Sequence, residues 1–116
     1  MAVREKQMGQ VVRFLLPSLK LKQVAEAGTT AEQRVHQFFI ESFGGYTAAS
    51  GNIFGYWKDE SGHNSYGEHR EFTVTAEHEQ QLQSIREFIA KIASELDEEC
   101  IFVEIGGRAS LIYANK

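Results

Sequence analysis

The amino-acid sequence predicts an α+β domain of the ferredoxin-like class, with the element order β-α-β-β-α-β and one short extra strand at the C-terminus. Two stretches have apolar residues at helical spacing, and β-forming stretches precede, separate and follow them. The 116 residues, 42% hydrophobic and with a single proline, suffice for one packed core and are too few for two domains. We therefore expect one domain over residues 10–116, with both helices on one face of an antiparallel sheet, after a flexible leader over residues 1–9.

The first strand is predicted over residues 10–16, where apolar side chains recur at every second position from Val12 onwards. Pro17 has no backbone N–H and therefore ends the strand. Residues 20–28 are expected to form a polar connection to the first helix.

The first helix is predicted to begin at Thr29 or Thr30, because two capping boxes overlap there. Thr29 is three residues before Glu32, and Thr30 is three residues before Gln33. Apolar residues then recur at helical spacing as far as residue 43, and the following glycine pair is typical of a helix C-terminus.

Residues 46–74 are predicted to form one long β-hairpin, with a polar tip over residues 59–67. Gly55 interrupts the alternation of its strand, which favours a bulge at or near this glycine. The returning strand is expected over residues 68–74.

The second helix is predicted over residues 76–96, capped by Thr75, because its apolar residues form an uninterrupted stripe. A strand over residues 100–105, a turn at Gly106 and Gly107 and a fifth strand to residue 113 complete the sheet. The acidic residues 97–99 between helix and strand are either a solvated loop or an acceptor for a cation or basic partner.

The alternation of the strands predicts an apolar open face on the sheet. If Val12 and its even-numbered neighbours point to the helices, then Val11 and Leu15 point away, and Phe102 joins them from the strand over residues 100–105. Exposed apolar residues in one patch are unfavourable in water, so we expect another copy of the chain to cover this face.

The same face is predicted to hold Arg13 between Glu71 and Glu104. This trio is either an ion-pair cluster in a subunit interface or a site for a charged small molecule. A pocket between two facing sheets is the enzymatic alternative, and it would contain Arg13, His69, Glu71, Cys100 and Glu104.

Aromatic residues on the hairpin are the other candidate binding surface, because rings on an extended ribbon can stack a ligand or grip a partner. The alternative is ordinary core and interface packing. The candidate ligand or interface residues are Arg13, Tyr56, Trp57, His63, Tyr66, His69, Glu71, Phe102 and Glu104.

Several functional classes are disfavoured by the sequence. The four histidines lack zinc-site spacing, Cys100 has no nucleophile elbow around it, and the glycines form no phosphate-binding motif, so we expect no catalytic residue, metal or cofactor. A formal charge of −4 argues against nucleic acid. The single cysteine and the absence of a signal peptide or a long apolar segment favour a soluble, cytoplasmic protein without a membrane partner.

The order of elements, with Tyr56 and Trp57 on the hairpin, resembles the small trimeric proteins of the CutA and PII signal-protein type. A pattern over residues 10–105 is also similar to that of uncharacterised small prokaryotic and phage-associated proteins. Its parts are Phe43-Gly44-Gly45-x-Thr47, Gly55-x-Trp57, Asp59-x-x-Gly62, Glu68 and Ile101-Phe102-Val103-Glu104. The resemblance to the CutA and PII type implies that subunits associate through their sheets and projecting hairpins.

We therefore expect a homo-oligomeric binding or regulatory protein rather than an enzyme. It is expected to contact a small ligand or a protein through its sheet face or through residues 59–67. Two alternatives stay open. One is an enzyme of the dimeric α+β-barrel type. The other is a phage or mobile-element accessory protein that sequesters a signal molecule or inhibits a host protein.

Overall fold

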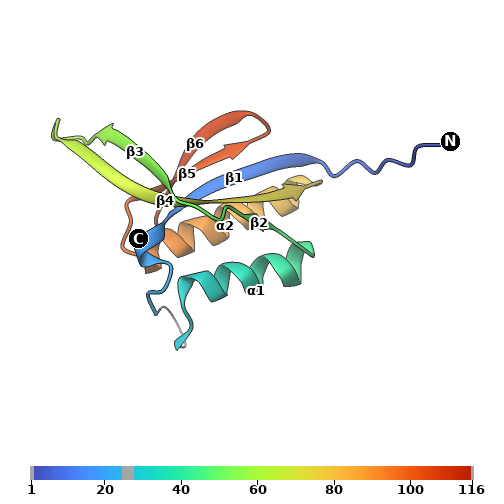
Figure 1. Ribbon diagram of the computed structural model, residues 1–116, viewed down its shortest axis with the longest axis horizontal. Helices are drawn as coiled ribbons and strands as arrows, with labels where there is room; N and C mark the ends of the chain where they lie inside the picture. Colours follow the sequence, from blue (N-terminus) through green and yellow to red (C-terminus); the bar gives the residue numbers. More distant parts are fainter. Residues whose placement is uncertain (1, 25–27, 116) are drawn as a thin grey trace.

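The computed structural model describes residues 2–24 and 28–115 and has the predicted α+β fold: an antiparallel sheet with two helices on one face and the other face open (Figure 1). The elements are β1 (Gln10–Pro17), the 3-10 turn η1 (Ser18–Lys20), α1 (Ala31–Phe43), β2 (Thr47–Ala48), β3 (Ile53–Lys58), β4 (Asn64–Ala76), α2 (Glu79–Glu95), β5 (Cys100–Ile105) and β6 (Arg108–Tyr113). The strand order is β2-β4-β1-β5-β6, and β3 pairs with β4 beyond β2. No helix in the described part of the chain is long and apolar enough to cross a membrane.

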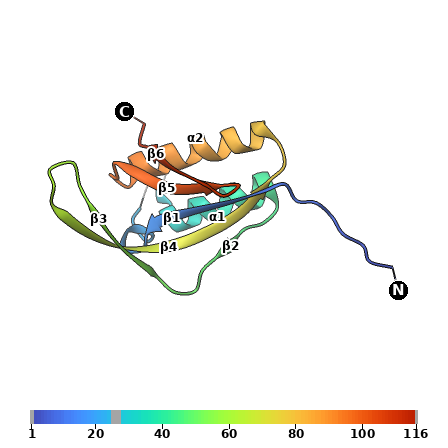
Figure 2. The same cartoon turned by 90° about the horizontal axis from the view of Figure 1, so that it is seen from above.

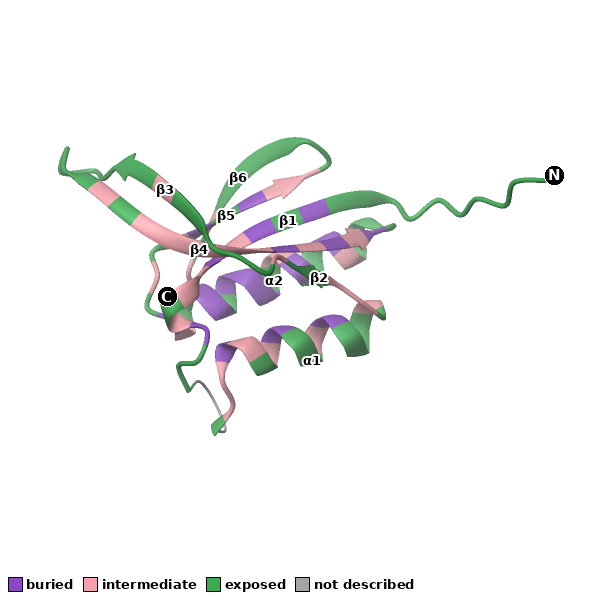
Figure 3. Cartoon of the chain, in the orientation of Figure 1, coloured by how far each residue is buried: buried purple, intermediate pink, exposed green. Residues whose placement is uncertain are grey.

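The central strands follow the predicted alternation. Val12 pairs with Val74 of β4 and with Ile105 of β5, so the three strands share one register of inward and outward side chains. The inward residues of β1 are buried, and the ring of Phe14 stacks on Phe72 and on Phe39 of α1. Figure 3 shows that the buried positions lie along the central strands and on the two helices that cover them.

The first helix begins as one of the two capping boxes predicts. The Thr30 side chain accepts a hydrogen bond from the Gln33 backbone N–H at 3.1 Å, and the Gln33 side chain accepts one from the Thr30 N–H at 2.9 Å. Gly44 ends the helix with a φ of 79°, which an L side chain rarely adopts.

The second helix begins three residues later than predicted. β4 continues to Ala76, which pairs with Gln10, so Thr75 lies in a strand and does not cap the helix. The side chain of Gln81 instead accepts hydrogen bonds from the backbone N–H groups of Glu77 and His78.

The predicted hairpin is present, because β2 and β3 both pair antiparallel with β4, but the bulge expected at or near Gly55 is misplaced. Gly55 pairs regularly with Gly67. The strand pairing is interrupted earlier, between β2 and β3, where residues 49–52 lie opposite only residues 70 and 71 of β4. The tip is also shorter than residues 59–67, because Asn64 to Gly67 belong to β4 and the turn covers residues 59–63. Figure 2 shows this hairpin and the N-terminal segment projecting from opposite ends of the domain.

The connection expected to be polar contains a core residue. Leu21 is only 1% exposed, whereas residues 25–27 of the same connection lie outside the described residues. Lys20 donates a hydrogen bond to the Leu96 carbonyl oxygen at 2.8 Å and forms an ion pair with Glu98 at 2.5 Å. The acidic run after α2 therefore accepts a cation, and that cation belongs to the chain itself.

Candidate functional site

The open face of the sheet brings Arg13 between two carboxylates. Its Nε lies 3.5 Å from Glu71 Oε1, and its Nη1 lies 3.5 Å from Glu104 Oε2. The strand pairing causes this arrangement: Arg13 is directly opposite Glu104 on β5, and Glu71 is diagonal to it on β4. The three side chains are between about a third and a half exposed, so a ligand can reach them from solvent.

Apolar side chains surround this cluster. Val11 and Phe102 are exposed, the latter by 41%, and Leu15 is partly so. Leu111 and Tyr113 of β6 extend the apolar area, because they pair with Phe102 and Cys100 and so share their face. These two residues are not among the candidates predicted from the sequence, since only the register of β6 assigns them to the open face.

The hairpin aromatics divide between the two faces of the sheet. Phe54 and Tyr56 share the helix side with Tyr66, whose ring centroid lies 6.0 Å and 5.1 Å from theirs. The Tyr66 hydroxyl donates a hydrogen bond to Glu68 at 3.3 Å. Desolvation, followed by the charge of Glu68, raises the pKa of the Tyr66 hydroxyl above its ordinary value.

Trp57 lies on the opposite side of the hairpin, with His69. Their ring centroids are 6.1 Å apart and the ring planes meet at 59°. Both residues belong to the open face, which makes the hairpin a continuation of the surface around Arg13. The predicted candidates Trp57, His69, Glu71 and Glu104 thus share one face, whereas Tyr56 and Tyr66 lie on the other.

His63 belongs to neither group. Its backbone N–H donates a hydrogen bond to Asp59 Oδ1 at 2.9 Å within the turn, and its ring lies 3.9 Å from the same carboxylate. Within residues 2–24 and 28–115, no three histidine, cysteine or acidic side chains converge as a metal site would require.

Cys100 is a half-buried strand residue. β1 separates its strand from that of His69, so the two cannot form a nucleophile and base pair. Burial, and then the charges of Glu99 and Glu98, raise the pKa of its thiol, which disfavours the reactive thiolate.

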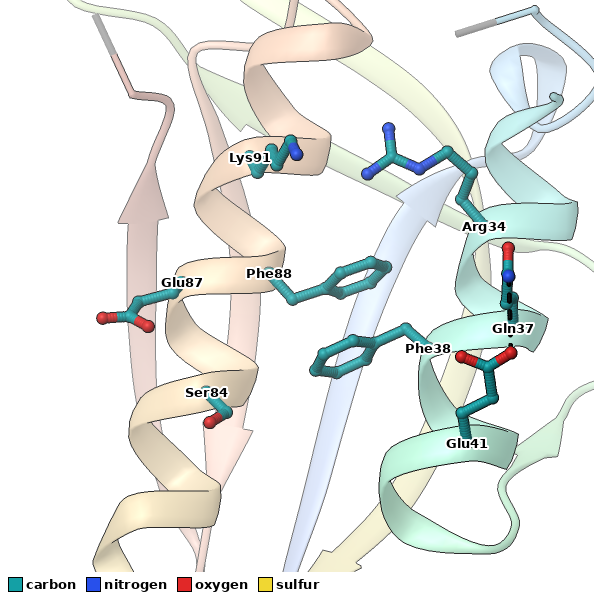
Figure 4. Close-up of a pocket in the computed structure, with 8 residues that line it drawn as sticks. All are labelled: Arg34, Gln37, Phe38, Glu41, Ser84, Glu87, Phe88 and Lys91. Atoms are coloured by element: carbon teal, nitrogen blue, oxygen red, sulfur yellow. Dashed lines mark hydrogen bonds between the residues drawn. The ribbon is translucent and has the colours of Figure 1, made fainter. Parts of the chain in front are cut away.

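A cleft of about 450 Å³ lies between α1 and α2, on the far side of the molecule (Figure 4). Phe38 and Phe88 stack across it with their centroids 4.2 Å apart, while Glu87 points away from it. Arg34 at its upper end forms an ion pair with Glu95. The stacked rings join the two helices, so the cleft is a packing seam, and its charged lining is separate from the open-face cluster.

No protein-family model matches the chain, and no curated protein matches it. Two solved structures of a phage SAM lyase match it over nearly the whole length. The structure in complex with S-methyl-5'-thioadenosine has a TM-score of 0.61 at 16% identity and covers 98% of this chain and 96% of its own. The apo structure has a TM-score of 0.60 at 13% identity, with 99% and 98% covered.

At such identities the likeness establishes the fold, and it agrees with the expected similarity to small phage-associated α+β proteins. It corrects the expectation that the chain is not an enzyme. That expectation was based on the lack of a recognisable catalytic motif, yet both matched structures are of a lyase that has the same fold without family-level sequence similarity.

Proposed function

We propose that the protein is a lyase that degrades SAM, S-adenosylmethionine, and releases S-methyl-5'-thioadenosine. The supporting observation is the match over 98% of the chain to a SAM lyase in complex with that nucleoside. This function also agrees with the alternative that the sequence left open, a phage accessory protein acting on a signal molecule.

The chemistry needs few groups from the protein. SAM carries a positively charged sulfonium, and breaking the bond between its sulfur and the amino-acid chain leaves the electron pair on sulfur, as the neutral thioether of S-methyl-5'-thioadenosine. A lyase adds no water. The remaining four-carbon fragment therefore leaves either as a lactone, closed by its own carboxylate, or as an unsaturated amino acid after loss of a proton to a base.

The open face offers groups suited to this substrate. Glu71 and Glu104 can attract the sulfonium or accept a proton, and the Arg13 guanidinium can bind the substrate carboxylate. Arg13 now holds both glutamates, so we propose that substrate binding exchanges these internal ion pairs for contacts with the substrate's own charges.

We also propose that the working unit is a homo-oligomer joined through the open face, as the resemblance to CutA and PII proteins implies. A second copy over Phe102 and Leu111 would remove them from water and enclose the Arg13 cluster, which a single copy leaves open. Binding of SAM without turnover is the second candidate function, because both glutamates are ion-paired with Arg13, which opposes their action as a base.

The test is incubation of the purified protein with SAM, followed by chromatographic measurement of S-methyl-5'-thioadenosine above a protein-free blank. Mass spectrometry of the second product distinguishes the lactone from the unsaturated acid. If Glu104 or Glu71 acts as the base, its replacement by Gln lowers kcat by about 10²- to 10⁴-fold.

The matched control is Glu41→Gln, the same substitution beside the helix cleft, which should leave the rate unchanged. Binding of SAM without formation of product would contradict the lyase function and support the second candidate function, a protein that sequesters SAM. A protein that neither binds nor converts SAM contradicts both.

A further inference from the structure

We infer that Trp57, packed over Gly67 and beside His69, is a stacking platform for the purine ring of a nucleoside. This inference rests on the proposed function and names the part of the chain that would hold the adenine. No residue with that role is assigned by the fold match.

The platform depends on the lack of a side chain at Gly67. A Cβ built there would lie 3.0 Å from Trp57 Cη2, 3.1 Å from Trp57 Cζ3 and 2.6 Å from His69 Cε1. The outer edge of the indole and the imidazole therefore occupy the space that any other residue would fill. Gly67 does not have a positive φ, so the packing of these two rings, and not the backbone conformation, favours glycine at this position.

The two rings form an open corner. Their planes meet at 59°, and Trp57 remains 49% exposed although its outer edge is packed against the strand. A planar heterocycle can stack on the free indole surface while its edge reaches the imidazole nitrogen atoms, which donate or accept hydrogen bonds. Aromatic side chains presented on a sheet bind bases in this way without demanding a particular sequence.

The position of the Trp57 platform relative to the Arg13 cluster also fits a nucleoside that carries a charged tail. Glu71 is the next residue after His69 on the same face of β4, about 7 Å further along the strand, and it belongs to the Arg13 cluster. The purine would lie on the hairpin and the sulfonium and amino-acid groups would point toward the charges at the centre of the sheet.

Trp57 is the single tryptophan, so its fluorescence reports on the platform directly. We expect S-methyl-5'-thioadenosine and adenosine to quench it at saturating concentrations, and free methionine to have no effect. Gly67→Ala should displace the imidazole of His69 and, to a smaller extent, the indole of Trp57. Nucleoside binding should then weaken, at most by the roughly 5- to 150-fold that corresponds to losing one base-stacking ring.

Gly55→Ala is the matched control, because Gly55 pairs directly with Gly67 and a Cβ there meets nothing within 4 Å. Circular dichroism and the thermal midpoint check that both variants are folded. Trp57→Phe should retain binding and Trp57→Ala should lose it, both measured by calorimetry since the fluorophore is gone.

The outcomes separate this inference from the proposed function. Quenching of the Trp57 fluorescence by a nucleoside, without any breakdown of SAM, supports the platform and contradicts the lyase function. Normal breakdown of SAM by folded Trp57→Ala, with an unchanged KM, overturns the platform and leaves the lyase standing. Equal weakening by Gly55→Ala and Gly67→Ala also overturns it.

Discussion

Arg13 illustrates how one side chain can serve both folding and binding. Its two ion pairs join β1 to β4 and to β5, yet partly exposed pairs of this kind stabilise a protein by only about 0–1 kcal/mol each. Packing of the buried residues on the opposite face of the same strands contributes far more. The cluster can therefore exchange its partners for a ligand's charges at little cost to the fold.

Cys100 gives a pH-dependent prediction. Because burial and the neighbouring Glu99 and Glu98 raise the pKa of its thiol, the folded protein holds this proton to higher pH than the unfolded chain does. The resulting stabilisation is fully present below the pKa of the unfolded thiol, near 9.0, and is lost as the pH rises through the higher folded value.

At pH 8 we therefore expect iodoacetamide to modify Cys100 more than about ten times faster in urea than in the native protein. Mass spectrometry of the alkylated fraction measures both rates. Glu99→Gln should speed the native reaction, because it removes one of the charges that raise the pKa of the thiol. Equal rates in native and unfolded protein would contradict the assignment.

The capping box of α1 makes a prediction for that element. Thr30→Ala removes the acceptor for the Gln33 N–H, so the free energy of unfolding should fall by about 1 kcal/mol. Urea titration followed by circular dichroism measures the change. Thr30→Ser keeps the hydroxyl and should lose much less, and a Thr30→Ala variant as stable as the wild type would show that the cap contributes nothing.

Elements whose determinants are local could be predicted from the sequence. Alternation fixed the two faces of β1, β4 and β5 and with them the neighbours of Arg13, and a short capping pattern located the start of α1. The errors arose where a distant partner decides the structure. Thr75 looks like a cap until pairing with β1 extends β4 past it, and only pairing with β4 shows the break after β2.

The candidate site was predictable to the same extent. Strand parity placed Glu71 and Glu104 together, but Trp57 was grouped with Tyr56 and Tyr66, because a supposed bulge at Gly55 hid the regular alternation of β3. The packing of Trp57 on Gly67 depends on the cross-strand pair Gly55–Gly67, and no local sequence pattern predicts that pairing.

The protein has a larger solvent-accessible surface than a typical monomer of its mass. Its accessible surface is 7841 Å², against about 6,400 Å² for a typical monomer of 13.1 kDa. The radius of gyration, 15.2 Å, likewise exceeds the roughly 13 Å of a compact chain of this length. The projecting hairpin and residues 2–9 account for this extended shape (Figure 2).

Oligomerisation through the open face can be tested with one charge. Phe102→Glu places a carboxylate beside Glu104, in the apolar area that includes Leu111. Packing of this face against a second copy would then bury an unpaired charge, which is unfavourable. We expect light scattering and native mass spectrometry to give an oligomer for the wild type and a folded monomer for this variant. Ile40→Glu is the control, because Ile40 is comparably exposed but lies on α1, away from the open face. A wild-type monomer at micromolar concentration would contradict the assembly, and an oligomer that survives Phe102→Glu but not Ile40→Glu would place the interface on the helices.

If the assembly also encloses the Arg13 cluster, the Phe102→Glu monomer should no longer break down SAM, although both glutamates remain in place. This result would separate the need for a second copy from the need for the two glutamates.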